Sequence, residues 1–242
     1  LNYEGTMNVD KAIEVSQNAP AAWLAQAVTP EACYDWLTQK LHFEHLTEED
    51  SHSPAAMALG GLNYGATTKE MAAAFQIFGN GGVYHKPYTY NYVRNHDNDI
   101  ILDNRGDPGE QVMSPEDATV MNKLLHRPTE GYNGTAAPQM SELNVDVFGK
   151  TGTTDSMYDY WFVGGTPFCV AAIWNGYSIP AYLEDSTIHK ITWRTVMEYM
   201  INNYDWSGSS YTLSDNVTQT AFCRSSGLLA GTKCYDIDYG WF

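Results

Sequence analysis

The tetrapeptide Lys150-Thr151-Gly152-Thr153 combines a cationic side chain, hydroxyl groups and a glycine at the end of a predicted strand. The free edge of such a strand can pair with an extended peptide, and Gly152 would let that peptide approach closely. The ammonium group of Lys150 and the hydroxyls of Thr151 and Thr153 are suited to receive a carboxylate. These residues predict a peptide-binding strand, although the Lys-Thr-Gly tripeptide alone fits an ordinary turn equally well.

A second polar group, Ser16-Gln17-Asn18, comes directly before an Ala-rich apolar stretch. A serine hydroxyl such as that of Ser16 can relay a proton between a base and a leaving amine. The amide of Asn18 can both donate to and accept from a peptide group of a substrate. Taken alone, these residues are explained more often by a turn with a helix N-cap, so they become a candidate site only if the fold brings them to Lys150.

Helix starts are recognised from their capping residues. Thr29, Thr67 and Ser114 each stand before a proline or an acidic residue of a first helical turn. They predict helices that run through residues 32–41, 71–78 and 118–126. A long helix is expected at 186–203, where a wide apolar stripe indicates burial against a sheet.

The hydrophobic pattern changes after residue 145 from a helical period to one typical of strands. Three strands are predicted at residues 145–150, 158–164 and 169–174, separated by short turns. Strands this close along the chain favour an antiparallel meander. Residues 97–109 are expected to form a polar loop around the short apolar run 100–102.

The balance of charges excludes several classes of partner. The 242 residues include 13 Lys and Arg against 29 Asp and Glu, which gives a formal net charge of −16. A polyanion of this size repels phosphate backbones and anionic lipids, so we expect no nucleic acid partner and no membrane contact by this chain. The sequence also lacks the run of about 20 apolar residues that a membrane-spanning helix needs.

The order of motifs resembles the transpeptidase domain of class A penicillin-binding proteins, in which Ser-x-Asn is followed far downstream by Lys-Thr-Gly. The resemblance extends over residues 1–205 and rests on the segments 16–18, 58–65, 68–78, 79–84, 86–88, 113–116, 150–154 and 159–167. It implies an α/β (α+β) fold like that of penicillin-binding proteins and serine β-lactamases. The antiparallel sheet would be flanked by helices and incomplete on its N-terminal side.

The resemblance also assigns roles to the two polar groups. It implies that Ser16, Asn18 and Lys150 are catalytic residues. It implies that Thr151, Gly152 and Thr153 form the strand that faces the ligand. No metal or organic cofactor is implied.

The sequence departs from the family pattern at the nucleophile. The family's attacking serine belongs to a Ser-x-x-Lys motif upstream of Ser-x-Asn, and no serine of this sequence has a lysine three residues later. Thr187-Ile188-His189-Lys190 and Ser214-Asp215-Asn216 are similar to family motifs but follow Lys150, which is the wrong order. We therefore expect this sequence to be the C-terminal part of a transpeptidase domain, with the Ser-x-x-Lys segment as its missing partner.

The activity that the resemblance implies is D,D-transpeptidation, the cross-linking of peptidoglycan stem peptides by serine acyl transfer, with acylation by β-lactams. The parent protein would carry a glycosyltransferase domain and a membrane anchor, at the extracytoplasmic face of the bacterial plasma membrane. This chain alone would be inactive. The alternatives are a β-lactamase or D,D-carboxypeptidase, with water as acceptor, and a non-catalytic penicillin-binding or peptide-binding module.

The sequence divides at residue 206. Residues 1–206 are expected to be the C-terminal part of the transpeptidase domain, and residues 207–242 a linker (207–211) and a small tail. The tail is similar to an extension found in many Gram-positive class A proteins, which favours a disulfide between Cys223 and Cys234 over two free thiols. His42 and His45 stand three residues apart, but a solvated helix end is favoured over a metal site.

Overall fold

A three-stranded antiparallel sheet forms the centre of the computed structural model, which describes residue 5, residues 7–206 and residues 209–242. Its strands, in spatial order, are β5 (Phe148–Thr153), β6 (Asp159–Gly165) and β7 (Val170–Gly176). The predicted meander is confirmed. The first strand begins at Phe148 instead of residue 145. The reason is that Phe148 pairs with Gly165, the last residue of β6, so β6 offers no partner for residues 145–147. The order places β5 at one edge of this sheet.

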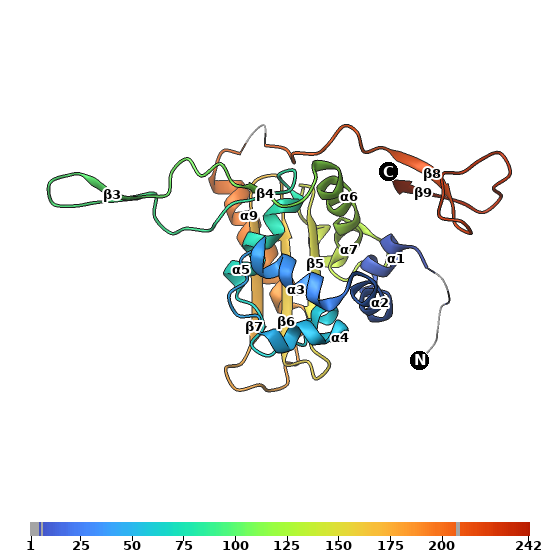
Figure 1. Ribbon diagram of the computed structural model, residues 1–242, viewed down its shortest axis with the longest axis horizontal. Helices are drawn as coiled ribbons and strands as arrows, with labels where there is room; N and C mark the ends of the chain where they lie inside the picture. Colours follow the sequence, from blue (N-terminus) through green and yellow to red (C-terminus); the bar gives the residue numbers. More distant parts are fainter. Residues whose placement is uncertain (1–4, 6, 207–208) are drawn as a thin grey trace.

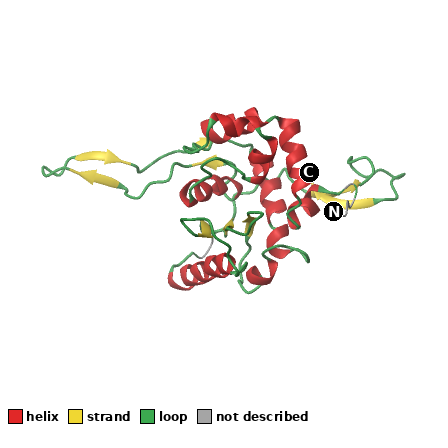
Figure 2. Cartoon of the chain, turned by 90° about the horizontal axis from the view of Figure 1, so that it is seen from below, coloured by secondary structure: helices red, strands yellow, loops and turns green. Residues whose placement is uncertain are grey.

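Helices cover both faces of the sheet (Figures 1 and 2). On one face α5 (Thr68–Phe75) contacts β6 and β7, and on the other α9 (Ile188–Asn203) contacts the same strands. Trp193 of α9 is fully buried and packs edge-on against Phe162, and its indole N–H donates to the backbone oxygen of Ala171 at 3.0 Å. The predicted burial of this long helix against the sheet is confirmed.

The other helices of the described residues pack around this core (Figure 1). They are α1 (Val9–Glu14), α2 (Asn18–Val28), α3 (Pro30–Gln39), α4 (Pro54–Leu59), α6 (Pro115–Leu125), α7 (Arg127–Glu130), α8 (Ala137–Met140) and the 3-10 helices η1 (Glu48–His52) and η2 (Gln76–Phe78). The predicted caps are confirmed, because each side-chain oxygen accepts a backbone N–H of the first turn: Thr29 from Ala32, Thr67 from Glu70 and Ser114 from Asp117.

Two short pairs of strands lie between α5 and α6 along the chain. The strand β1 (Val83–Tyr84) pairs with β4 (Glu110–Gln111), and β2 (Tyr92–Arg94) pairs with β3 (Ile100–Asp103). The second pair forms an arm that extends away from the body in Figure 1. The prediction of a loop over residues 97–109 is wrong at β3, because the apolar run there pairs with β2 instead of entering the core.

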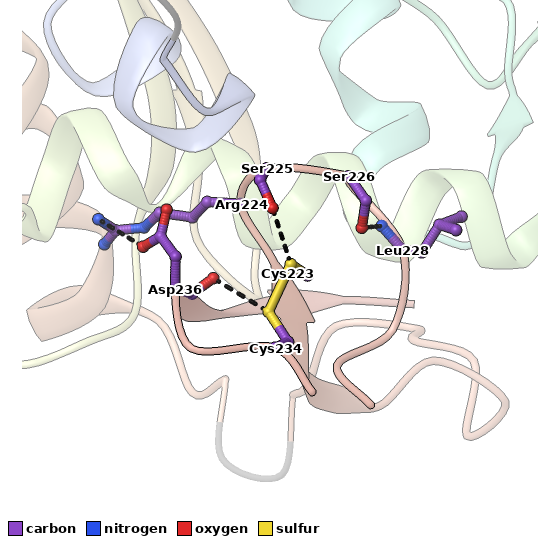
Figure 3. The surroundings of a disulfide bond; sticks show 7 residues. All are labelled: Cys223, Arg224, Ser225, Ser226, Leu228, Cys234 and Asp236. Atoms are coloured by element: carbon purple, nitrogen blue, oxygen red, sulfur yellow. Dashed lines mark hydrogen bonds and ion pairs between the residues drawn. A yellow bond between two sulfur atoms is a disulfide. The ribbon is translucent and has the colours of Figure 1, made fainter. Parts of the chain in front are cut away.

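The C-terminal tail forms a hairpin of β8 (Gln219–Cys223) and β9 (Ile237–Trp241). A disulfide joins Cys223, the last residue of β8, to Cys234, as predicted (Figure 3). The predicted linker at 207–211 includes residues 207 and 208, which lie outside the described residues. Its last residue, Tyr211, donates from its hydroxyl to the backbone oxygen of Asp146 at 2.7 Å and so contacts the body of the molecule.

No helix within the described ranges 7–206 and 209–242 has the length and apolar character to cross a membrane.

Replacing Gly149 with Ala is expected to lower the free energy of unfolding by about 1–3 kcal/mol through overpacking. A methyl group on Gly149 would lie 2.6 Å from the ring of Phe162, which is fully buried, and 2.9 Å from the backbone oxygen of Val163. Denaturant unfolding of variant and wild type measures the difference. Gly61→Ala is the control, because no atom lies within 4 Å of its new methyl. Equal losses in the two variants would contradict the packing argument.

Candidate active site

The side chains of Lys150 and Ser16 meet, although the two residues lie 134 positions apart in the sequence. The ammonium Nζ of Lys150 donates to Ser16 Oγ at 2.6 Å and to the backbone oxygen of Thr151 at 2.9 Å. Lys150 lies in the middle of β5, and Ser16 lies in the turn between α1 and α2. The fold therefore brings a strand residue and a turn residue together at the edge of the sheet.

Ser16 has an uncommon backbone conformation. Its φ is 57°, in the left-handed region that few residues other than glycine adopt. Ser16 lies in a turn directly before the N-cap of α2, which is Gln17, and the Gln17 side chain makes no cap hydrogen bond. Asn18 is the first residue of α2, and its side chain is exposed.

The three residues that follow Lys150 form the C-terminal half of β5. Thr151 shares a hydrogen bond of 2.7 Å with the hydroxyl of Thr135, and Thr153 is exposed at the end of the strand. Gly152 lies opposite Trp161, and a Cβ built on Gly152 would lie 3.3 Å from the Cβ of Trp161. The neighbouring strand therefore also favours a glycine here, apart from any approach of a ligand.

Burial changes the acid–base character of Lys150. The low polarity around its ammonium group lowers the pKa of Lys150 from 10.5 to about 8. A lysine with a pKa near 8 can give up and take up a proton near neutral pH, as a general base must. With Ser16 in hydrogen-bond contact, the pair can pass a proton to or from a group bound at the edge of β5.

The sequence matches the penicillin binding protein transpeptidase domain over residues 1–173. The chain belongs to this family. A relative from Clostridium tetani named penicillin-binding protein 1A is 29% identical over 245 residues, which cover 96% of this chain and 30% of the relative. The chain spans less than a third of the length of the curated relatives that it matches first, between 16% and 30%.

Solved structures of penicillin-binding proteins have the same fold. Penicillin-binding protein 1A from Haemophilus influenzae aligns with a TM-score of 0.73 at 18% identity, over 99% of this chain and 40% of that one. PonA1 from Mycobacterium tuberculosis in complex with penicillin V aligns with a TM-score of 0.67 at 21% identity, over 84% of this chain and 59% of that one. The expected fold class is confirmed.

Two residues near the contact between Ser16 and Lys150 carry no clear signal in the sequence. Thr135 contacts Thr151, as described above, and its backbone oxygen accepts from Lys190 Nζ at 3.1 Å. Thr135 follows Gly134 in a stretch that is typical of a turn, and nothing in that pattern indicates contact with β5. Lys190 belongs to the Thr-x-x-Lys segment at the start of α9, where it acts as a donor to this turn.

Other candidate residues of the sequence have structural contacts. Ser214 and Asn216 donate from their side chains to Glu116 of α6, each at 2.8 Å. The ring nitrogen Nδ1 of His45 lies 3.1 Å from a carboxylate oxygen of Glu70. The expected helix end at His42 and His45 is wrong, because α3 already ends at Gln39. Within the described part of the chain, no group of three or more His, Cys, Asp or Glu side chains is arranged to hold a metal ion.

Proposed function

We propose that this chain forms most of the active site of a class A D,D-transpeptidase, which cross-links peptidoglycan stem peptides. The observation that carries this proposal is the contact between the half-buried Lys150 and Ser16 at the edge of β5. The name penicillin-binding protein 1A of the relatives and the penicillin V complex of a protein with the same fold support it. A serine from a Ser-x-x-Lys segment outside this sequence would supply the nucleophile.

In the proposed reaction, the oxygen of that serine attacks the carbonyl carbon of the penultimate D-alanine, and its proton passes through Ser16 to the neutral amine of Lys150. The carbon–nitrogen bond then breaks, and the terminal D-alanine leaves as an amine that receives a proton through Lys150 and Ser16. The amine of a second stem peptide next attacks the acyl-enzyme ester and releases the serine. No cofactor takes part in these steps.

The same groups would bind the substrate. The exposed amide of Asn18 would hold a peptide group of the stem, while Lys150, Thr151 and Thr153 would receive its terminal carboxylate. Gly152 would let the stem backbone lie close to β5 as an added strand. A β-lactam would place its carboxylate on the same donors, and opening of its ring amide would leave it attached to the serine.

The wider organisation of the protein is part of this proposal. Residues 1–206 would be the C-terminal part of the transpeptidase domain, and residues 207–242 a linker and a small disulfide-bonded tail. The parent protein would be anchored in the plasma membrane of a bacterium, with this domain and a glycosyltransferase domain on the extracytoplasmic side.

Intact mass spectrometry with a labelled penicillin tests the proposed function. The full-length protein is expected to gain the mass of one drug molecule, and the chain of residues 1–242 is expected to gain none. An adduct on the bare chain would contradict the assignment of the nucleophile, and no adduct on either protein would contradict the function. Release of the adduct within seconds, as in a β-lactamase, would favour hydrolysis over transpeptidation.

The rate of acylation is expected to rise with pH, with a midpoint near pH 8. The reason is that Lys150 acts as a base only after it loses its proton, and burial lowers its pKa to about 8. Stopped-flow fluorescence with a fluorescent penicillin, between about pH 6 and pH 11.5, measures this profile. A rate that is constant over this range, or a midpoint near 10.5, would show that Lys150 is not the base.

A further inference from the structure

The turn that carries Ser16 cannot hold its conformation by local interactions alone. Ser16 has a positive φ, which is costly for a residue with a side chain and persists only where surrounding contacts fix it. The preceding helix α1 spans only Val9–Glu14, and helices this short are not stable in isolation. A contact outside this turn must therefore keep Ser16 in place.

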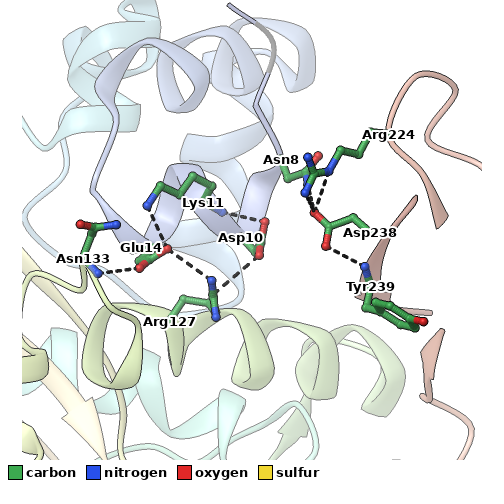
Figure 4. Close-up of polar contacts among 9 residues, drawn as sticks. All are labelled: Asn8, Asp10, Lys11, Glu14, Arg127, Asn133, Arg224, Asp238 and Tyr239. Atoms are coloured by element: carbon green, nitrogen blue, oxygen red, sulfur yellow. Dashed lines mark hydrogen bonds and ion pairs between the residues drawn. The ribbon is translucent and has the colours of Figure 1, made fainter. Parts of the chain in front are cut away.

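Glu14 makes such a contact. Its side chain lies at the end of α1 and is buried, with 2% of the residue exposed. One carboxylate oxygen accepts the backbone N–H of Asn133 at 2.8 Å, and the other lies 3.3 Å from both Lys11 Nζ and Arg127 Nη2 (Figure 4). A buried carboxylate is costly unless it is paired and hydrogen-bonded, and these three donors meet that need.

The carboxylate of Glu14 is charged at neutral pH. Burial by itself raises the pKa of Glu14, but the N–H of Asn133 and the cations of Lys11 and Arg127 outweigh burial and hold the pKa below its ordinary value. The guanidinium Nε of Arg127 also lies 3.6 Å from a carboxylate oxygen of Asp10. Arg127 of α7 therefore contacts two carboxylates of α1.

The contacts of Glu14 continue to β5. Asn133 stands two residues before Thr135, and the hydroxyl of Thr135 shares a hydrogen bond with Thr151. On the other side, Glu14 stands two residues before Ser16, which accepts from Lys150. Together with the short chain segments between them, these contacts form a closed ring that contains both the buried carboxylate and the Ser16–Lys150 pair.

Gly131 shows how closely the loop fits around this carboxylate. A Cβ built on Gly131 would lie 2.6 Å from Glu14 Oε1 and 2.5 Å from the backbone oxygen of Arg127. The backbone of Gly131 is extended, with φ −63° and ψ 150°, so the turn itself does not require a glycine. A glycine is needed here because a side chain would clash with both the Glu14 carboxylate and the backbone of Arg127.

We propose that Glu14 is a positioning residue of the transpeptidase site, which holds Ser16 against Lys150 by fixing α1 to the loop that leads to Thr135. This inference rests on the proposed function. Glu14 touches no reacting atom and acts through Ser16. Its effect should therefore appear in the rate of acylation and depend on the presence of the Ser16 hydroxyl.

The first test measures acylation of the full-length protein by a fluorescent penicillin. Glu14→Gln keeps the size of the side chain but sets its amide N–H₂ against the donors of Lys11 and Arg127. We expect the maximal acylation rate to fall about 100-fold, as for a misplaced catalytic group, while the apparent dissociation constant of the penicillin stays within about twofold. Gly131→Ala, which keeps every charge, is expected to lower the rate in the same direction.

The Ser16→Ala background separates positioning from a general loss of stability. In that background we expect Glu14→Gln to change the rate by less than about twofold, because the two residues act through one contact. Asp50→Asn is the control, since Asp50 is 3% exposed and accepts the backbone N–H groups of Thr47 and Asn63. It should lower the unfolding temperature and leave acylation unchanged. Rate losses that multiply in the double variant, or an equal loss in Asp50→Asn, would overturn the inference.

A second readout does not depend on catalysis. We would measure the labelling of Lys150 by an amine-reactive ester against pH, with peptide mass spectrometry. Glu14→Gln is expected to move the midpoint from about 8 toward 10.5, because a relaxed Ser16 turn admits water to Lys150. An unchanged midpoint would overturn the inference. If the wild type is not acylated by penicillin, the proposed function fails, and this labelling experiment still decides the role of Glu14.

Discussion

The variant Lys150→Met is expected to lower the rate constant of acylation by a penicillin about 10³- to 10⁴-fold in the full-length protein. Methionine has a similar length and is apolar, so the strand and its packing are retained. What is lost is the amine that contacts Ser16 and that, in the proposed function, donates to a bound carboxylate. Stopped-flow measurement of acylation at pH 8 gives the rate constant.

The stability of this variant provides an internal check. Burial lowers the pKa of Lys150 in the folded protein, so the charged lysine destabilises the folded state at pH below about 8, and this penalty disappears as the pH rises toward 10.5. At pH 7 we therefore expect Lys150→Met to unfold at a temperature no lower than that of the wild type. A marked loss of stability would instead attribute the lower rate to misfolding.

Lys123→Met is the matched control for this variant. Lys123 lies on α6, with its ammonium group 5.2 Å from the centre of the Trp241 ring in the tail hairpin. Its loss should leave acylation unchanged. If both lysine variants slowed acylation equally, the role assigned to Lys150 would be wrong.

The variant Ser16→Ala is expected to lower the acylation rate constant about 10²- to 10³-fold. In the proposed mechanism, Lys150 loses the hydroxyl through which it exchanges a proton with the bound substrate, while its amine remains to receive a carboxylate. The loss should therefore appear in the maximal rate and much less in the apparent dissociation constant of the penicillin. Rates over a range of penicillin concentrations separate the two quantities.

The double variant tests whether Ser16 and Lys150 act as a unit. Ser16→Ala combined with Lys150→Met is expected to be no slower than Lys150→Met alone, because groups in one proton path are not additive. Ser141→Ala is the control, since the hydroxyl of Ser141 is exposed and bonds only a nearby backbone oxygen, of Pro138, at 3.3 Å. Losses that multiply would indicate two independent roles.

Much of the fold could be predicted from local chemistry. The hydroxyls of Thr29, Thr67 and Ser114 cap helices as expected, because a cap depends only on residues within one helical turn. The meander was also predictable, since the turns between its strands are short. The first and last residues of the strands could not be predicted, because β5 begins and ends where its pairing with β6 does, whatever the hydrophobic pattern.

The site could be predicted in part, and only through the resemblance to a family. Ser16 and Lys150 were indicated as candidates, but no local pattern gives the 2.6 Å between their side chains. Thr135 and Glu14 were missed because their roles depend on the loop between α7 and α8, whose path is set by packing. A buried carboxylate that joins two distant segments has no signature in a single sequence.

A crystal structure of the full-length protein acylated by penicillin tests the central claim most directly. We expect the ester to lie beside Ser16 and Lys150, with the penicillin carboxylate on the hydroxyls of Thr151 or Thr153 and its side-chain amide at Asn18. An acyl group bound elsewhere, with Lys150 and Ser16 buried away from it, would contradict the account.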